Sequence, residues 1–90
     1  MATAVFVDGL PLHFTHDDLH KLFTGFGRIE TAFVAKLPTG RSLGFGFVRF
    51  AYFTDAEEAV QALSGSLVLG HTLTAYIADA PKRDFETGTS

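Results

Sequence analysis

Aromatic rings are the side chains of this sequence with the clearest capacity for binding chemistry. The 90 residues include ten Phe and two Tyr, but no Trp and no Cys. Two of the rings, Phe45 and Phe47, alternate with Gly44 and Gly46 in the segment Leu-Gly-Phe-Gly-Phe-Val-Arg-Phe. This is more ring surface than a core of this size plainly requires, so we expect some rings to be exposed for use in binding.

Other patterns that could carry chemistry are weak. His13, His16 and His20 cluster, and the i, i+4 spacing of the last two could bind a metal from one helical turn. No third ligand follows, so we interpret all three as solvated histidines. The Gly-Phe-Gly segment at 25–27 is half of a dinucleotide loop, but it ends a helical pattern instead of opening one. With no catalytic dyad or triad visible, the sequence predicts neither an enzyme nor a cofactor or metal site.

The elements that must position the rings can be predicted from periodicity. Runs of β-branched and aromatic residues predict four strands, at 4–10, 29–37, 43–50 and 73–77. A helical pattern follows the first and the third strand. The order β-α-β-β-α-β predicts an α+β fold: a ferredoxin-like split βαβ sandwich in which two helices cover one face of a four-stranded antiparallel sheet.

The ends of the two helices carry sequence signals. Thr15 with Asp18 and Thr54 with Glu57 form capping-box patterns, which predict a first helix of about a dozen residues and a second helix after Thr54. Gly27 is expected to end the first helix in a left-handed conformation. The segment at 65–70, with a glycine at each end, predicts a loop.

Strand parity predicts which rings face water. Phe45 and Phe47 share a row with Arg49, whereas Gly44 and Gly46 share the opposite row with Val48. The corresponding pairs elsewhere are Phe6 with Asp8 in the first strand and Tyr76 with Thr74 in the last. Taken alone, a Phe in a strand is usually a core residue. Because a charge is rarely buried without a partner, however, these rows should be exposed, and the glycines should let the helices approach the other face.

Parity does not assign Phe33 in the second strand. Glu30 and Lys36 lie on the opposite parity, together with Ala32 and Val34. Charged and apolar residues therefore mix in that row, and both the open face and the core stay possible for Phe33.

The net charge and the distribution of apolar residues limit which ligands and locations we expect for this protein. The formal charge of −3 has the wrong sign for long-range attraction of a phosphate backbone. There is no apolar run of membrane-spanning length and no secretory signal, so we expect a soluble intracellular domain, in the nucleus or cytoplasm or in an organelle, that is monomeric and has no membrane partner. Its predicted bounds are 1–81, followed by a loosely ordered tail at 82–90.

Residues 43–50 resemble the octapeptide of the RNA recognition motif (RRM) family, basic-Gly-aromatic-Gly/Ala-aromatic-aliphatic-any-aromatic, at every position except the first. The segment 5–10, Val-Phe-Val-Asp-Gly-Leu, is similar to the family's companion hexapeptide, with Gly9 where Asn is usual. The resemblance runs from about Val5 to Ala80. It implies the strand order 4-1-3-2, with the two motif strands side by side at the centre of the sheet.

The resemblance also implies a ligand, single-stranded RNA, and a role in RNA processing or regulation. Phe6 and Phe47 would stack on successive bases, and Phe45 would pack against a sugar or between nucleotides. Each stacked base is worth roughly 1–3 kcal/mol, so three rings could supply low-micromolar binding. The RNA-binding residues implied are Phe6, Asp8, Phe33, Lys36, Arg41, Leu43, Phe45, Phe47, Arg49, Tyr76, Lys82 and Arg83.

The charge pattern predicts that stacking outweighs phosphate contacts. Leu43 stands where the family has a basic residue, and Arg41 could compensate only in part. At the helix starts we expect acidic residues, namely Asp17, Asp18, Asp55, Glu57 and Glu58. Around the open face we expect the basic residues Lys36, Arg41, Arg49, Lys82 and Arg83. Three acids oppose them there: Asp8, Asp79 and Asp84. If all five basic side chains contacted phosphates, the slope of log affinity against log salt concentration would be at most about −3.5.

The main alternative is an RRM-fold protein–protein interaction module within a ribonucleoprotein complex, with a partner on the acidic helical face. Family members that bind peptides on the helical side usually lack the sheet aromatics and carry an Arg-x-Phe signature after the second helix. Neither feature applies to this sequence, so RNA is the favoured ligand. A small-molecule-binding regulatory domain would need a polar pocket signature, which is missing, and would not need three exposed rings.

Overall fold

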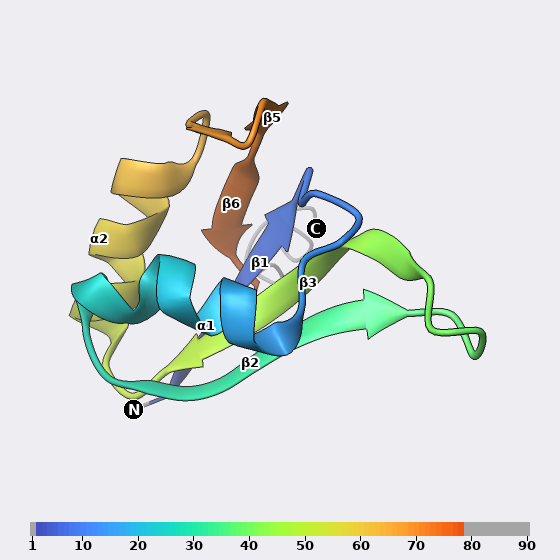
Figure 1. Cartoon of the computed structure of the whole chain (residues 1–90). Coiled ribbons are helices and arrows are strands. Elements are labelled where there is room, and N and C mark those ends of the chain that lie inside the picture. The colour runs from blue at the N-terminus through green and yellow to red at the C-terminus, as the bar shows by residue number, and fades with distance from the viewer. Residues whose placement is uncertain (1, 79–90) are drawn as a thin grey trace, which may run out of the picture.

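A four-stranded antiparallel sheet forms one layer of the structure and two helices form the other (Figure 1). The computed structural model describes residues 2–78. The sheet contains β1 (Thr3–Asp8), β2 (Ile29–Lys36), β3 (Ser42–Phe50) and β6 (Thr74–Ile77) in the order β2-β3-β1-β6. This is the predicted 4-1-3-2 order, and the predicted fold class is confirmed.

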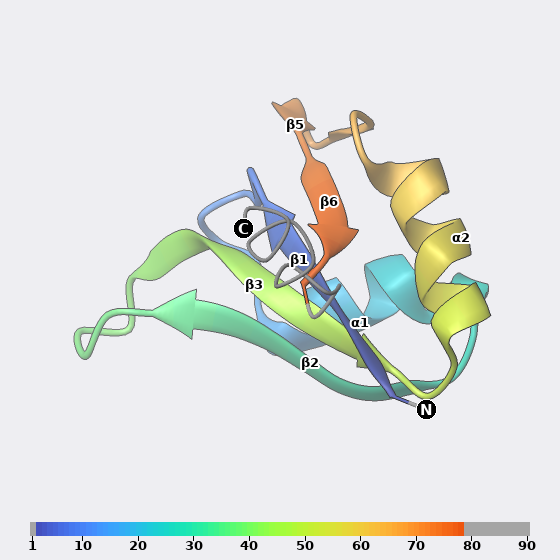
Figure 2. The same cartoon turned by 180° about the vertical axis from the view of Figure 1, so that it is seen from behind.

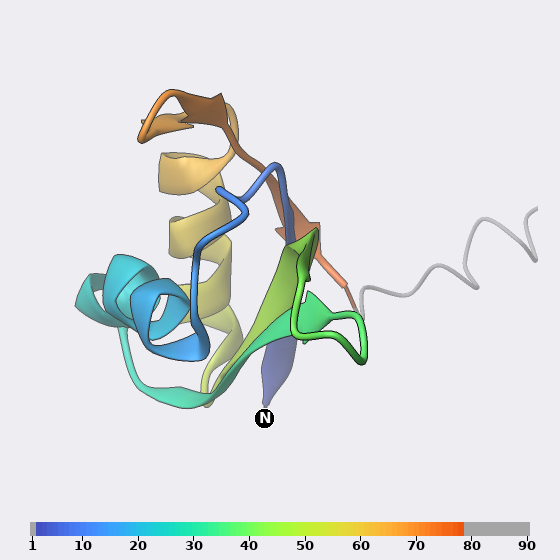
Figure 3. The same ribbon diagram turned by 45° about the vertical axis from the view of Figure 1, so that its right-hand side comes forward.

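Both helices, α1 (His16–Phe23) and α2 (Phe53–Leu63), pack on the same face of the sheet. Figure 3 shows this sheet nearly edge-on, with the helices to one side. No helix or strand of residues 2–78 covers the other face, which Figure 2 shows from the front. We call this uncovered surface the open face.

The predicted capping box at the start of α1 is present. The Thr15 backbone N–H donates to the Asp18 carboxylate at 3.0 Å, and Thr15 Oγ1 accepts from the Asp18 N–H at 3.1 Å. The first of these bonds is the main reason that the pKa of Asp18 lies below its usual value. The helix ends in a 3₁₀ turn, η1 (Thr24–Phe26), which Gly27 caps with a positive φ of 154°. The glycine stop therefore lies where it was predicted, although its ψ of −165° is not that of a left-handed helical residue.

The capping box predicted for the second helix is also wrong. The helix α2 begins at Phe53, one residue before Thr54, and its N-cap residue Tyr52 makes no side-chain capping bond. The Ala51 N–H already donates to the Arg28 carbonyl at 2.9 Å, and the Tyr52 carbonyl accepts from Ala56, so the chain passes from β3 almost directly into the helix. Of the acids expected at this helix start, Asp55 lies in the first turn, whereas Glu57 and Glu58 lie further along.

The segment predicted as a loop between α2 and the last strand contains a short hairpin, β4 (Leu67–Val68) and β5 (His71–Thr72). Its two turn residues, Leu69 and Gly70, both have positive φ, at 51° and 83°. Such turns favour Asn-Gly or Asp-Gly. Because Leu69 occupies the first position here, the usual sequence signal for this hairpin is missing.

The core lies between the helices and the inner rows of the strands, as parity predicts. Alternate residues of β3 are buried, and Phe50 at its end meets Phe23 of α1 with ring centroids 6.2 Å apart. The core residues are Val5, Val7, Leu10, Phe14, Leu19, Phe23, Val34, Val48, Phe50, Ala56, Ala59, Leu73 and Ala75.

The role predicted for the β3 glycines is only partly right. Gly44 and Gly46 do lie in the buried row. A Cβ atom on Gly46, however, would overlap the carbonyl oxygen of Phe33, a backbone atom of the neighbouring strand. Gly46 is therefore needed for the approach of β2 to β3, and no helix atom is among its nearest neighbours.

Candidate nucleic-acid interface

Four aromatic residues, one from each strand, form a continuous row across the sheet. Phe47 on β3 is the register partner of Phe33 on β2 and of Phe6 on β1, and Phe6 is also the partner of Tyr76 on β6. We call Phe33, Phe47, Phe6 and Tyr76 the ring row. Because neighbouring strands lie about 4.8 Å apart, the row is about 14 Å long. It runs across all four strands of the sheet, whose arrangement can be followed in Figure 2.

The rings of the row contact one another in two groups. The centroids of Phe6 and Tyr76 lie 5.1 Å apart, and Phe6 also lies 5.5 Å from Phe45, which is one register step further along β3. On the other side, Phe33 and Phe47 lie 5.4 Å apart. All three pairs are tilted by 32–34°, a geometry that is typical of packed aromatic pairs.

The rings are accessible to a ligand. The exposed fractions are 43% for Phe33, 37% for Phe47 and 51% for Tyr76, whereas Phe6 and Phe45 are half-buried between their neighbours. By contrast, Phe50 on the opposite parity of β3 is fully buried. Large aromatic residues that gather on one uncovered surface are a mark of a binding site.

Phe33 reaches the open face because β2 is irregular. Ile29 pairs with Phe50, whose side chain lies in the core. Thr31, only two residues later, pairs with Arg49, whose side chain lies on the open face. The extra residue is Glu30, and this bulge shifts the parity of the strand. A second irregularity lies between Val34 and Lys36. The sequence positions of Glu30 and Lys36 therefore could not predict on which face of the sheet Phe33 lies.

His16 continues the ring row around the β2 edge. Its ring is stacked on Phe33 with centroids 5.3 Å apart and planes 19° apart, and its Nδ1 accepts a hydrogen bond from the Val34 N–H at 2.9 Å. The interpretation of His16 as a merely solvated histidine is therefore wrong. The i, i+4 spacing with His20 pointed to a metal instead, and no local sequence signal indicates that the start of α1 meets β2.

Asp8 and Leu43 lie on one side of the ring row, next to Phe45. Asp8 is the register partner of both Phe45 and Thr74, is exposed, and accepts the Gly9 N–H at 2.8 Å through Oδ1. Its second carboxylate oxygen has capacity to accept from a ligand. Leu43, beyond Phe45 on the same parity, is 45% exposed, so the open face presents an aliphatic group where the family octapeptide has a cation.

The basic residues predicted for the site lie in different places. Arg49 is exposed on the open row of β3, next to Phe47, whereas Lys36 and Arg41 are exposed at the connection between β2 and β3. None of these three cations takes part in an ion pair among residues 2–78, where the single salt bridge joins Lys21 to Asp17. Lys82 and Arg83, together with Asp79, Asp84 and the predicted domain end at 81, lie outside the described residues.

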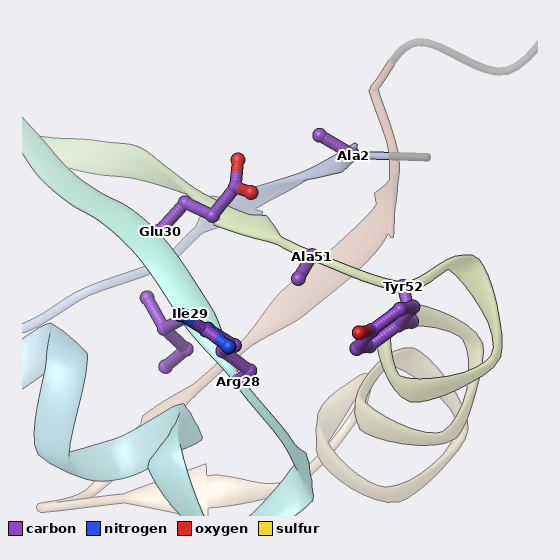
Figure 4. Close-up of a pocket in the computed structure, with 6 residues that line it drawn as sticks. All are labelled: Ala2, Arg28, Ile29, Glu30, Ala51 and Tyr52. Carbon is purple, nitrogen blue, oxygen red and sulfur yellow. The ribbon is translucent and has the colours of Figure 1, made fainter.

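One hollow of the described surface lies away from the ring row. It has a volume of about 550 Å³ and lies where β1 and β2 begin and β3 ends, lined by Ala2, Arg28, Ile29, Glu30, Ala51 and Tyr52. Figure 4 shows the Glu30 carboxylate pointing away from the Arg28 side chain. The lining carries one charge of each sign and no residue of the ring row, so this hollow is separate from the row.

Residues 2–78 contain neither a candidate metal site nor a helix that could span a membrane. No group of three or more His, Cys, Asp or Glu side chains is placed to hold a metal ion. Neither helix of this part of the chain has the length and apolar character that crossing a membrane would require.

Comparison with known proteins agrees with this geometry. Residues 5–74 match the model of the RNA recognition motif family. A Caenorhabditis elegans protein named "Probable splicing factor, arginine/serine-rich 6" is 43% identical over 70 residues, which are 78% of this chain. The match spans only 37% of that relative's length.

Solved structures give the same result. The Sex-lethal RNA recognition domains 1 and 2 from Drosophila melanogaster superpose with a TM-score of 0.83 at 32% identity, covering 87% of this chain and 50% of that one. A structure named "SXL-lethal protein/RNA complex" gives a TM-score of 0.80 at 32% identity, covering 84% of this chain and 47% of that one. The chain belongs to the RNA recognition motif family.

Proposed function

We propose that this chain binds single-stranded RNA on the open face, with unpaired bases stacked on the ring row and on Phe45. The observation that carries the proposal is the register of Phe33, Phe47, Phe6 and Tyr76, which supplies one accessible ring on every strand. Single-stranded RNA is the ligand whose flat groups repeat along a flexible backbone, and open-sheet aromatics are a known platform for such bases.

Base stacking is the main source of affinity in this proposal. Only Arg49 places a cation beside the ring row, and Lys36 and Arg41 lie at the connection between β2 and β3. If all three met phosphates, they would give a salt slope of about −2, far below that of a strongly electrostatic complex. Each stacked base, in contrast, is worth about 1–3 kcal/mol.

The polar groups around the row have secondary roles. We propose that Asp8 accepts hydrogen bonds from base edges, and that Leu43 contacts the ribose or base next to Phe45. Lys82 and Arg83 would add phosphate contacts from beyond the described residues. The binding unit is proposed to span residues 1–81, and its role is to hold RNA without catalysis.

The biological setting is inferred from the relatives. The nematode protein is named as a splicing factor, and the SXL-lethal structure is named as a protein/RNA complex. We therefore propose a role in RNA processing, in the nucleus or the cytoplasm. No observation favours the alternative of a protein-binding RRM: the exposed rings of Tyr52 and Phe53 at the start of α2 are not part of a register-matched row such as that of the open face.

The test is a binding titration with a fluorescein-labelled, single-stranded RNA of ten nucleotides and random sequence, followed by anisotropy. The wild type should bind, and the Phe45→Ala/Phe47→Ala variant should lose at least about 30-fold in affinity if each ring carries a base. Phe53→Ala is the matched control, because Phe53 is an exposed Phe of α2 on the helical side. Unchanged binding by the double variant would refute the proposal.

A further inference from the structure

His16 joins the helical layer to the ring row. It is the first residue of α1, yet its side chain reaches the outer edge of β2, against which α1 packs (Figure 1). The strand β2 has a neighbour on one side only, β3. The Val34 N–H donates to His16 Nδ1, so the imidazole satisfies one of the backbone hydrogen-bond donors at this edge of the sheet.

That hydrogen bond fixes the chemical form of the ring. While Nδ1 accepts from the Val34 N–H it carries no proton, so the N–H donor of the ring in this arrangement is Nε2–H. The ring is held in place on one face by Phe33 and at Nδ1 by Val34. Since His16 is exposed, the side of the ring away from Phe33 can receive another flat group.

The surroundings of His16 favour a base over a phosphate. A hollow of about 320 Å³ lies beside it, lined by His16, Asp17 and His20 of α1 and by Glu30, Thr31 and Ala32 of β2. The carboxylates of Asp17 and Glu30 would repel a phosphate, and Lys21 is already paired with Asp17 at 3.3 Å. An uncharged aromatic ligand meets no such penalty and can accept a hydrogen bond from Nε2–H.

We infer that His16 is a fifth ring position, which takes one further unpaired base after the strand of RNA has crossed the ring row and turned around the β2 edge. The inference rests on the proposed function, because the ligand is the same RNA. It adds a subsite on the helical side of the sheet edge, outside the octapeptide and hexapeptide segments. The site is a stacking site, so it should contribute to affinity without contributing to salt dependence.

The test compares two random-sequence RNAs, of four and eight nucleotides, by anisotropy. The four-nucleotide RNA is short enough to be held by the ring row, whereas the eight-nucleotide RNA can also reach His16. We expect His16→Ala to weaken binding of the longer RNA about 5- to 10-fold, the lower end of the range for one base stack, and binding of the shorter RNA less than about twofold. The salt slope should stay unchanged. His71→Ala, at an exposed histidine of β5 outside the four-stranded sheet, is the matched control and should change neither affinity.

Two replacements separate stacking from a purely structural role. His16→Phe keeps a ring but loses the acceptor for Val34, whereas His16→Gln keeps an acceptor but loses the ring. Near wild-type binding of the longer RNA by the Phe variant, but not by the Gln variant, would support the inference. The reverse pattern, or an equal effect of His16→Ala on both RNAs, would overturn it. If the wild type bound neither RNA, the proposed function would fail, and this inference with it.

Discussion

Phe33 on β2 and Phe47 on β3 are direct register partners, and their ring centroids lie 5.4 Å apart on the open face. This pair connects the edge strand to the central motif strand. Because Phe47 is also the partner of Phe6, the accessible aromatic surface spans the whole sheet and is not confined to the two central strands. The proposed RNA path therefore begins and ends at the edges of the sheet.

The two faces of β3 should respond in opposite ways to the loss of a ring. Phe50→Ala removes a fully buried side chain that packs on Phe23, and should lower the free energy of unfolding by about 3–5 kcal/mol. Phe47→Ala removes an exposed ring and should cost about 1 kcal/mol, while RNA affinity falls about 5-fold or more. Urea unfolding and RNA titration of the two variants would check this. A steep loss of stability in Phe47→Ala would show that its ring is a core group.

Gly46→Ala should disrupt the site from inside the sheet. The added Cβ would overlap the Phe33 carbonyl oxygen, so β2 must move away from β3. We expect a loss of about 1–3 kcal/mol of stability, measured by urea unfolding, together with weaker RNA binding because Phe33 leaves the row. Gly25→Ala is the control, since nothing lies within 4 Å of its Cβ position. Equal effects of the two substitutions would contradict the account of Gly46.

Leu43→Lys should strengthen RNA binding by restoring a cation at the octapeptide's first position. One added phosphate contact should make the salt slope more negative by about 0.7 and raise affinity about fivefold at low salt. Leu67→Lys makes the same charge change at an exposed leucine of β4, outside the four-stranded sheet, and should have a much smaller effect. Titrations at several salt concentrations would measure both. A slope that does not change with Leu43→Lys would place the RNA backbone elsewhere.

The capping box of α1 predicts a pH dependence of stability. The Thr15 backbone N–H holds the pKa of the Asp18 carboxyl below its usual value. A depressed pKa means that the stabilisation is present above the unfolded-state pKa, near about 4, and is lost as pH falls through the folded-state pKa. Asp18→Asn should therefore lower the urea midpoint at pH 7, and the difference from wild type should shrink in strongly acidic solution.

Asp17→Asn is the control for that measurement, because Asp17 lies next to Asp18 but forms an exposed ion pair with Lys21 instead of the capping bond. Its effect on the midpoint should be small, as for most surface ion pairs. If the deficit of Asp18→Asn were the same at both pH values, the charge of the carboxylate would have no part in the cap.

The sequence was sufficient to predict the position of a residue where the local pattern and the folded geometry agree. Alternation in 43–50 placed Phe45, Phe47 and Arg49 on the open face, and the box at Thr15 and Asp18 placed the start of α1. It was insufficient for Phe33, because the bulge at Glu30 changes the parity of β2 and depends on pairing with β3. It was also insufficient for His16, whose partners Phe33 and Val34 are distant in sequence.

The most direct test of the ring row is the map of backbone amide shifts during titration with a short single-stranded RNA of random sequence. The account predicts the largest changes at and beside Phe33, Phe47, Phe6 and Tyr76, one on each of the four strands of the sheet, with α2 unaffected. Changes confined to the helices, or no changes at saturating RNA, would contradict it.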